Sequence, residues 1–325
     1  MTLDVAGLVA AARDGSPRAV ARLISLVEDA APELRPVMAA LAPLAGSARI
    51  VGLTGSPGVG KSTTTAALVG AFRARDLRVG VLAVDPSSPF SGGALLGDRV
   101  RMQDHALDPG VFIRSMASRG HLGGLSWATP QALRVLDAAG CDVILVETVG
   151  VGQAEVEVAS LADSTVVLLA PGMGDAIQAA KAGILEVADV YVVNKADRDG
   201  ADNTVRDLRN MISQGDGPHG GWTPPIVKTV AARGEGIDSL VERLDEHWAW
   251  LTSTGEGARR RTARAAAEIE AIAVTALRER LGDLHQGTAL DTLASSVVAG
   301  ETDPYAAADA LVAGVVEPGR TVATP

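Results

Sequence analysis

Seven short runs of aliphatic and β-branched residues recur through the middle of this chain, and longer segments with helical periodicity separate them. Most of the runs are apolar without interruption. That is typical of strands covered by helices on both faces, because a strand with one solvated face alternates apolar and polar residues. The pattern predicts an α/β fold with a doubly wound, mostly parallel sheet. We expect its strands at residues 50–54, 79–85, 111–114, 143–148, 165–170, 190–194 and 226–229.

Helical extensions are predicted on both sides of this sheet. The N-terminal residues carry apolar side chains at helical spacing, interrupted at Gly15 and near Pro32 and Pro36. The predicted domains are a helical extension at 1–46, a sheet-containing domain at 47–252 and a helical arm at 253–325.

The C-terminal arm is predicted to begin with a linker at 252–257, where Ser, Thr and Gly gather. A long helix is expected at 258–281, with apolar residues repeating along one face. A last helix is signalled by Thr302-Asp303 as its cap and Pro304 in its first turn, and it is expected to continue through 306–312.

The acidic balance of the chain limits its partners. The formal net charge is −10, which argues against broad binding to nucleic acid or anionic membranes, since phosphate-rich partners require a basic surface. The apolar stretch at 5–12 follows Asp4, the wrong flank for a secretory signal, and no apolar run reaches the length of a membrane span. The single cysteine, Cys141, precedes an apolar run and is predicted to be a buried free thiol. We therefore expect a cytoplasmic protein.

A glycine-rich loop follows the first predicted strand and precedes a helix. Its sequence matches the pattern G-x-x-x-x-G-K-[ST] of phosphate-binding loops. Glycines let backbone N–H groups turn inward around a β-phosphate, Lys61 reaches the β- and γ-phosphates, and Ser62 offers a hydroxyl to Mg²⁺. Thr63 is placed to touch the α-phosphate. The predicted loop comprises Gly55, Ser56, Pro57, Gly58, Val59, Gly60, Lys61, Ser62 and Thr63.

Two acidic residues end predicted strands and are candidates for the metal site. Asp85 ends the second strand, and Glu147 follows four apolar residues in the fourth. Ligands bind at the carboxyl ends of parallel strands, so both carboxylates can face the metal. Glu147 with Gly150 fits the position at which a carboxylate orders metal-bound water and a glycine N–H meets the γ-phosphate. An ordinary surface carboxylate is the alternative at each position.

The sixth strand ends in Asn194-Lys-Ala-Asp197, a pattern that selects the base. A carboxylate at Asp197 can accept hydrogen bonds from both N1–H and the exocyclic amine of guanine, which adenine does not offer together. Asn194 would tie this segment to the phosphate loop, and the stem of Lys195 would lie over the base. Backbone N–H groups would meet the guanine oxygen from the segment after the seventh strand, which comprises Ala231, Ala232 and Arg233. GTP or GDP is therefore the expected ligand.

These motifs together resemble the SIMIBI class of P-loop GTPases, and within it the MeaB/ArgK (MMAA-type) chaperones of methylmalonyl-CoA mutase. The resemblance runs nearly end to end, and Glu147 stands where many GTPases carry aspartate. The matching segments are 55–63, 84–102, 147–153 and 194–197.

The resemblance implies several residue roles. Asp85, Asp98 and Glu147 would surround Mg²⁺, the stretch at 87–101 would be a mobile switch, and a second switch would contain Lys181. Spacing alone makes Lys181 a solvated helix residue, and that alternative stays open.

The resemblance also implies a partner and an activity. Such proteins form homodimers, hydrolyse GTP and act on adenosylcobalamin-dependent methylmalonyl-CoA mutase, gating cofactor loading and protecting the enzyme. In this chain the residue after Gly150 is Val151, where small GTPases carry a water-orienting glutamine, so we expect slow turnover without a partner.

Three other functions remain as alternatives. An ATPase or kinase associated with amino-acid transport is disfavoured by the guanine-selecting pattern. A metallochaperone GTPase would want a cluster of Cys or His, whereas this chain has one cysteine and five scattered histidines. A protein that binds GTP without hydrolysing it would need the same binding residues.

Overall fold

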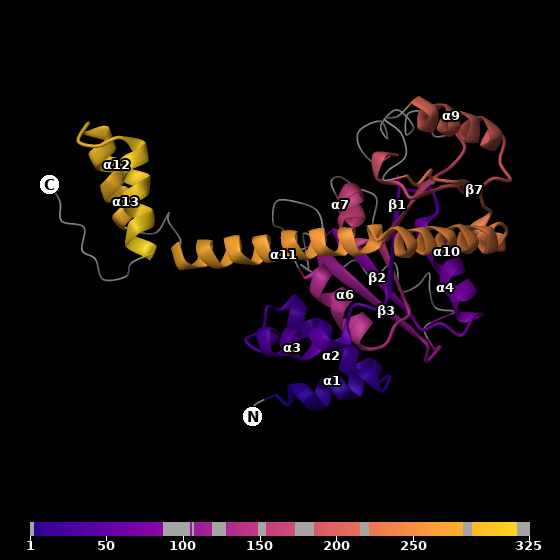
Figure 1. The fold of residues 1–325 in the computed structure, drawn as a ribbon, viewed down its shortest axis with the longest axis horizontal. Helices are drawn as coiled ribbons and strands as arrows, with labels where there is room; N and C mark the ends of the chain where they lie inside the picture. The colour runs from indigo at the N-terminus through magenta and orange to yellow at the C-terminus, as the bar shows by residue number, and fades with distance from the viewer. Residues whose placement is uncertain are drawn as a thin grey trace. The chain divides into compact units, whose positions relative to one another are not determined.

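The computed structural model describes residues 3–86, 105, 107–118, 128–148, 154–172, 185–214, 221–281 and 288–316. Within these residues the centre is a seven-stranded sheet in the order β3-β2-β4-β1-β5-β6-β7, with every pair of neighbours parallel (Figure 1). The predicted α/β fold is thus confirmed. The strands are β1 Arg49–Thr54, β2 Val79–Pro86, β3 Val111–Ser118, β4 Val143–Thr148, β5 Ser164–Leu169, β6 Val190–Val193 and β7 Ile226–Lys228.

Helices cover both faces of the sheet, which explains why its strands are apolar on both sides. One face packs against α2, α6 and α7, with α1 and α3 packed on α2 and α6 outside them and α9 covering the β5–β6 end, and the other face packs against α4 and α10. The helices of the first 260 residues are α1 Val5–Arg13, α2 Pro17–Glu28, α3 Leu34–Leu41, α4 Lys61–Arg73, α6 Thr129–Ala138, α7 Ala154–Leu161, α9 Ala201–Gln214 and α10 Ile237–Thr254, with short 3-10 turns η1 Ala42–Leu44, η3 Leu185–Val187 and η4 Ala231–Arg233.

The N-terminal helices are fixed to the sheet by buried polar contacts as well as apolar packing. Asp137 of α6 accepts hydrogen bonds from the backbone N–H groups of Gly46 (2.5 Å) and Ala48 (3.0 Å), so it holds the segment that enters β1. Arg114 of β3 pairs with Glu28 of α2. Residues 3–46 are therefore an integral layer of the folded domain.

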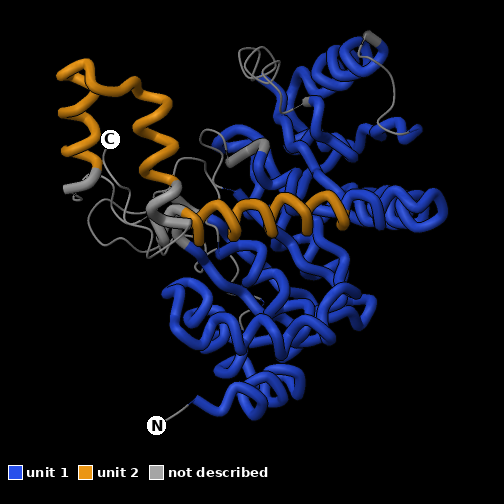
Figure 2. The backbone as a smooth tube through the Cα atoms, turned by 60° about the vertical axis from the view of Figure 1, so that its left-hand side comes forward, with its two compact units in different colours: residues 1–260 blue, residues 261–325 orange. Residues whose placement is uncertain are grey.

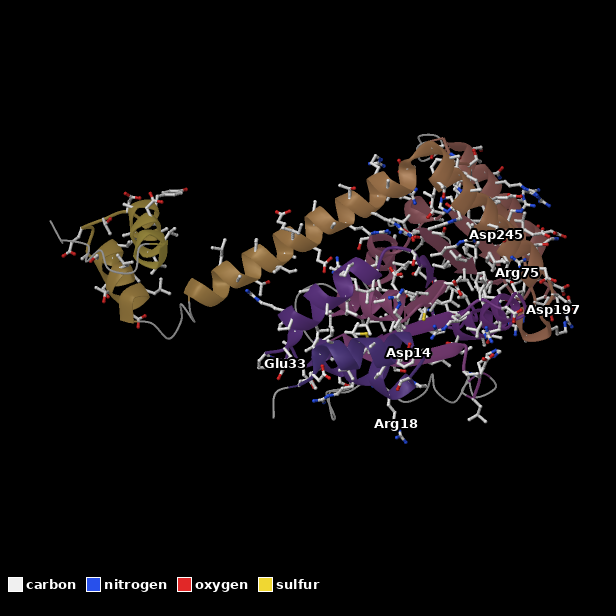
Figure 3. All side chains as sticks on the ribbon, turned by 60° about the horizontal axis from the view of Figure 1, so that its bottom comes forward. Asp14, Arg18, Glu33, Arg75, Asp197 and Asp245 are labelled. Carbon is white, nitrogen blue, oxygen red and sulfur yellow. The ribbon has the colours of Figure 1, made fainter. Side chains whose placement is uncertain are left out.

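Two ion pairs of Asp245 join α10 to the start of β1 and to the end of α4. Asp245 accepts from Arg49 at the start of β1 (2.7 Å) and from Arg75 just after α4 (2.8 Å; Figure 3). Arg49 also lies over the ring of Trp248. All four side chains lie near the surface, so the contacts orient α10 more than they stabilise it.

The predicted linker at 252–257 is wrong, although the long helix after it is confirmed. α10 continues to Thr254, one left-handed residue, Gly255 (φ 75°), breaks it, and α11 begins at once as Glu256–Leu281. The hydroxyls of Thr252 and Thr254 donate to backbone carbonyls one turn earlier, at Trp248 and Trp250, so these polar side chains continue the helix.

The chain forms two compact units, residues 1–260 and 261–325 (Figure 2). The second unit contains most of α11, together with α12 (Thr288–Val298) and α13 (Pro304–Val316), which contact each other. Asp303 caps α13 as predicted, accepting from the N–H groups of Tyr305 and Ala306. Helix α12 was not predicted from the sequence. None of the described helices is both long and apolar enough to cross a bilayer.

The thiol of Cys141 is buried at the start of β4, as the sequence predicts. Burial raises its pKa to about 12, because a thiolate would lose its hydration there. The group is therefore an unreactive packing residue.

A buried polar cluster holds the start of α11 to the sheet. Asp189, just before β6, accepts from the backbone N–H of Thr165 (2.8 Å) and from Arg260 Nη1 (3.1 Å). His247 of α10 places Nε2 3.3 Å from the same carboxylate and Nδ1 2.7 Å from Ser164 Oγ. Although a serine, a histidine and an aspartate meet here, all three are buried and leave no room for a substrate. The cluster is structural.

Replacing Arg260 with alanine should lower the free energy of unfolding by about 2 kcal/mol, because Asp189 would stay buried with part of its charge uncompensated. The arginine side chain is 23% exposed, which keeps the loss below that of a fully buried pair. Urea unfolding of the full chain measures the change. Arg259→Ala is the matched control: Arg259 is 73% exposed and pairs with Glu256, which Arg260 also contacts, rather than with Asp189, so the midpoint should not move. Equal losses from both substitutions would contradict the role given to Asp189.

Candidate nucleotide-binding site

The phosphate loop connects the end of β1 to the start of α4. Three of its glycines adopt positive φ, Gly55 at 141°, Gly58 at 79° and Gly60 at 98°. A Cβ on Gly55 would lie 2.3 Å from the carbonyl oxygen of Leu168, and one on Gly60 would lie 2.4 Å from the side-chain nitrogen of Asn194. Side chains are excluded at these two positions by both conformation and space. The glycine spacing that defines the motif is therefore required by this backbone.

Lys61 lies inside the loop, at the first residue of α4. Its side chain is largely buried, and Nζ donates to the carbonyl oxygens of Gly55 (2.6 Å) and Ser56 (3.2 Å). The positive end of the α4 dipole and the adjacent backbone N–H groups add to this charge. The arrangement suits the binding of a polyphosphate.

Ser62 and Glu147 meet beside the loop. Because Leu53 of β1 pairs with Glu147 of β4, the end of β4 lies next to the phosphate loop. Ser62 Oγ donates to Glu147 Oε1 at 2.5 Å, and both residues are buried. A hydroxyl and a carboxylate are hard oxygen donors of the kind Mg²⁺ prefers, so the pair fits that ion. Within the described part of the chain, no three His, Cys, Asp or Glu side chains gather as a metal site.

Several residues predicted for the metal and γ-phosphate site lie wholly or partly outside the described residues. Asp85 is the last but one residue of β2, which runs one residue further than expected, and its backbone pairs with Ala117; the predicted role of its side chain falls outside what the structure describes. The predicted roles of Asp98, Gly150 and Lys181 also fall outside the described residues.

Asn194 links the base-selecting segment to the phosphate loop. Its Nδ2 donates to the carbonyl oxygen of Val59 (2.8 Å), while Oδ1 accepts from Thr229 Oγ1 and from the Ala231 N–H, both at 3.1 Å. The side chain is buried, so one amide fixes three segments together. Sequence reasoning predicted the link to the loop but missed Thr229, whose position at the end of β7 is the signal that could have found it.

Lys195 and Asp197 follow on the surface side of this junction. Lys195 has a left-handed backbone (φ 57°), and its Nζ donates to the Gly58 carbonyl oxygen at 2.7 Å. The Asp197 side chain is 41% exposed and lies 3.5 Å from Arg233 of η4 (Asp197 is labelled in Figure 3). Two amides of η4 have partners, since Ala231 donates to Asn194 and Arg233 donates to the Val230 carbonyl. The described residues thus bring the phosphate loop, Glu147 and the base-selecting segment together at the carboxyl ends of the strands.

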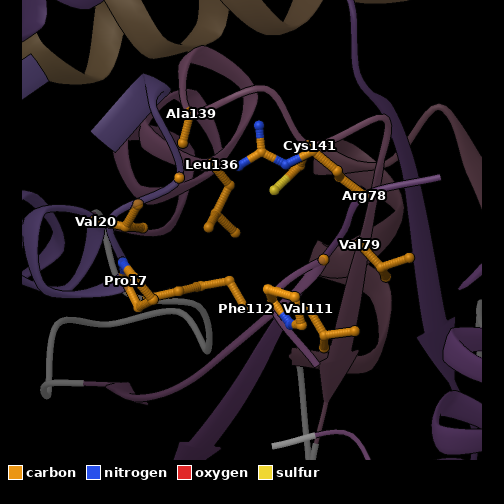
Figure 4. Close-up of a pocket in the computed structure, with 12 residues that line it drawn as sticks. Pro17, Val20, Arg78, Val79, Val111, Phe112, Leu136, Ala139 and Cys141 are labelled. Atoms are coloured by element: carbon orange, nitrogen blue, oxygen red, sulfur yellow. The ribbon is translucent and has the colours of Figure 1, made fainter. Parts of the chain in front are cut away.

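A separate pocket lies at the opposite end of the strands, by the first residues of β2 and β3 (Figure 4). Its volume is about 30 Å³, and the side chains around it include Val20, Phe112, Leu136 and Cys141. That space suits little more than a water molecule, and the lining is largely apolar. We assign it no ligand.

Comparisons with known proteins agree with this site. The family model described as "Methylmalonyl Co-A mutase-associated GTPase MeaB" matches residues 20–285. A putative GTPase of Pyrococcus horikoshii is 46% identical over 312 residues, covering 95% of this chain and 98% of its own. The GTPase ArgK of Escherichia coli is 38% identical over 251 residues, covering 75% of this chain and 76% of its own.

A solved structure has the same architecture over the whole length. The crystal structure of an LAO/AO transport system kinase superposes with a TM-score of 0.72 and 26% identity, covering 98% of this chain and 100% of that one. Relatives that match 95% to 97% of this chain are named putative GTPases. This chain belongs to the MeaB family of methylmalonyl-CoA mutase-associated GTPases.

Proposed function

We propose that this GTPase requires Mg²⁺ and uses its nucleotide state to control methylmalonyl-CoA mutase, as a chaperone that gates loading of the cobalamin cofactor and protects the mutase from inactivation. The observation that carries the proposal is the hydrogen bond between Ser62 and Glu147. This hydrogen bond joins the phosphate loop to the end of β4. The residues that follow Glu147 in the sequence, as far as Gly150, would respond to the γ-phosphate. The family name supports the mutase as the partner.

The site residues would divide the work of GTP hydrolysis. Lys61 and the amides of residues 55–63 would bind the phosphates, and Ser62 and Glu147 would hold the metal, with Asp85 and Asp98 as further proposed ligands. Mg²⁺ held by these residues would offset the negative charge of the phosphates. Asn194 and Lys195 keep the base-binding segment against the loop, where Asp197 would read guanine.

The partner proposal predicts a stimulated rate. GTP turnover by the full chain should be slow alone and should rise several-fold when the adenosylcobalamin-dependent mutase is added. The measurement is phosphate release at saturating GTP. Lys228→Ala is the control variant, because it removes an exposed ion pair with Asp202, and the mutase should stimulate it as it does the wild type. A turnover rate that the mutase leaves unchanged would remove the partner proposal while leaving the GTPase itself intact.

We also infer that two copies of the chain associate through the second unit. Ile269, Ile272 and Leu277 form a stripe at helical spacing on α11, and their exposed fractions are 68%, 49% and 54%. An apolar stripe of this kind is unfavourable in water, and a second α11 would cover it. Light scattering should give the mass of a dimer, and Ile269→Glu should give a monomer; a monomeric wild-type protein at micromolar concentration would contradict the inference.

A further inference from the structure

We propose that Arg233 is a positioning residue for base selection: it orients the Asp197 carboxylate so that the site distinguishes guanine from bases that lack its 2-amino group. The proposal rests on the guanine site proposed above and gives it a further determinant. Arg233 Nη2 lies 3.5 Å from Asp197 Oδ2, and the two side chains come from different loops, after β7 and after β6.

Asp197 needs such a partner because its own surroundings hold it weakly. The side chain is 41% exposed at the end of a loop, and it must present both oxygens in the plane of the base to accept two hydrogen bonds. A carboxylate accepts about four hydrogen bonds, so an arginine on one oxygen leaves room for both hydrogen bonds from guanine.

Arg233 is itself fixed in place by the turn that carries it. Its Nε pairs with Glu235 Oε1 at 2.8 Å, and the backbone of Glu235 is held by a hydrogen bond from Val230 N–H (3.0 Å). Gly236 closes the turn with φ 77°, and a Cβ there would lie 2.2 Å from the Lys228 carbonyl oxygen.

The planar guanidinium uses Nε for Glu235 and Nη2 for Asp197, a fixed pair of donors that a lysine ammonium cannot reproduce. The turn therefore presents Arg233 to Asp197 in one orientation. The effect on binding should be moderate, because an exposed ion pair contributes little by itself.

The comparison of GDP with IDP isolates the proposed role. Hypoxanthine keeps N1–H and the 6-oxo group but lacks the 2-amino group, so IDP can give Asp197 one hydrogen bond where GDP gives two. A carboxylate that has lost its orientation should therefore cost GDP more than IDP. A merely structural role of Arg233 would weaken both nucleotides by the same factor.

The experiment is displacement of a fluorescent GDP analogue from the full chain by GDP, IDP and ADP in Mg²⁺, for wild type, Arg233→Ala and Arg233→Lys. We expect Arg233→Ala to weaken GDP about fivefold and IDP less than twofold, with Arg233→Lys in between. Arg243→Ala is the charge-matched control, since Arg243 pairs with Glu246 within α10, and its ratio should equal that of wild type. Thermal unfolding of each variant identifies any loss of folding.

Two outcomes are separable. If wild type binds ADP as well as GDP, the guanine site itself is wrong. If wild type prefers GDP but the GDP-to-IDP ratio is the same in Arg233→Ala, the positioning role of Arg233 is overturned and the guanine site stands.

Discussion

Replacing Lys61 with alanine should reduce GTP turnover by at least about a hundredfold, the scale seen when one donor to developing charge is removed from an active site. The ammonium is buried in the concave side of the loop, 2.6 Å from the Gly55 carbonyl oxygen, and no solvated cation can take its place there. With GTP bound as proposed, the ammonium would offset the charge that builds on the β–γ bridge and the γ-phosphate as the bond breaks. Steady-state phosphate release measures the loss.

Lys228→Ala is the control for Lys61→Ala, because it removes the same charge from an exposed ion pair. The control should keep the wild-type rate, and both variants should unfold near the wild-type temperature. A Lys61→Ala protein that is folded and retains more than a tenth of the wild-type rate would show that the loop binds phosphate without contributing to catalysis.

Replacing Asp197 with asparagine should weaken GTP binding by about a hundredfold, because two charge-assisted hydrogen bonds to N1–H and the 2-amino group would be lost or reversed. The same variant should gain affinity for XTP. Xanthine keeps N1–H but has a 2-oxo group, to which the new side-chain amide can donate while its carbonyl oxygen accepts from N1–H. Competition of GTP, XTP and ATP for the site measures the exchange.

The exchange of preference separates base recognition from folding. A misfolded variant would lose GTP and XTP together, whereas a folded protein with an altered base contact exchanges one for the other. If Asp197→Asn bound GTP as tightly as wild type, Asp197 would not be the residue that reads guanine. Asn194→Ala is unsuitable for this test, since Asn194 is buried and joins three segments.

The sheet could be predicted from the sequence because its strands are covered on both faces, and continuous apolar runs follow from that cover. β3 shows the limit of the argument. It was expected to end at residue 114 but continues to Ser118. Arg114 interrupts the apolar pattern, and it is tolerated because Glu28 of α2 pairs with it. A partner 86 residues away along the chain gives no local signal.

The helical segments from residue 252 onward were less predictable for a different reason. Serine and threonine usually favour loops. Because of them, the sequence predicts a linker before α11 and no helix at α12 (Thr288–Val298). Around Thr252 and Thr254 the hydroxyls bond to carbonyls of the preceding turn, so the same residues are compatible with helix. Only Gly255, with its left-handed backbone, ends α10.

The candidate site divides in the same way. The phosphate loop and the base-selecting segment are visible as motifs, because each needs fixed residue types at fixed spacing. The contacts that hold them together come from residues with ordinary local patterns. Thr229 supports Asn194. Glu235 supports Arg233 through a turn in which Gly234 and Gly236 both have positive φ. Such contacts follow from the fold and not from the sequence pattern.

The most direct test of the account is the steady-state hydrolysis of GTP and ATP by the purified full chain in Mg²⁺, measured side by side as kcat/KM. Asn194 and Lys195 hold the segment that carries Asp197 against the phosphate loop. If Asp197 reads guanine as proposed, GTP should be preferred by at least about a hundredfold, the value of two well-oriented hydrogen bonds. Equal hydrolysis of the two nucleotides would contradict the guanine site at Asp197.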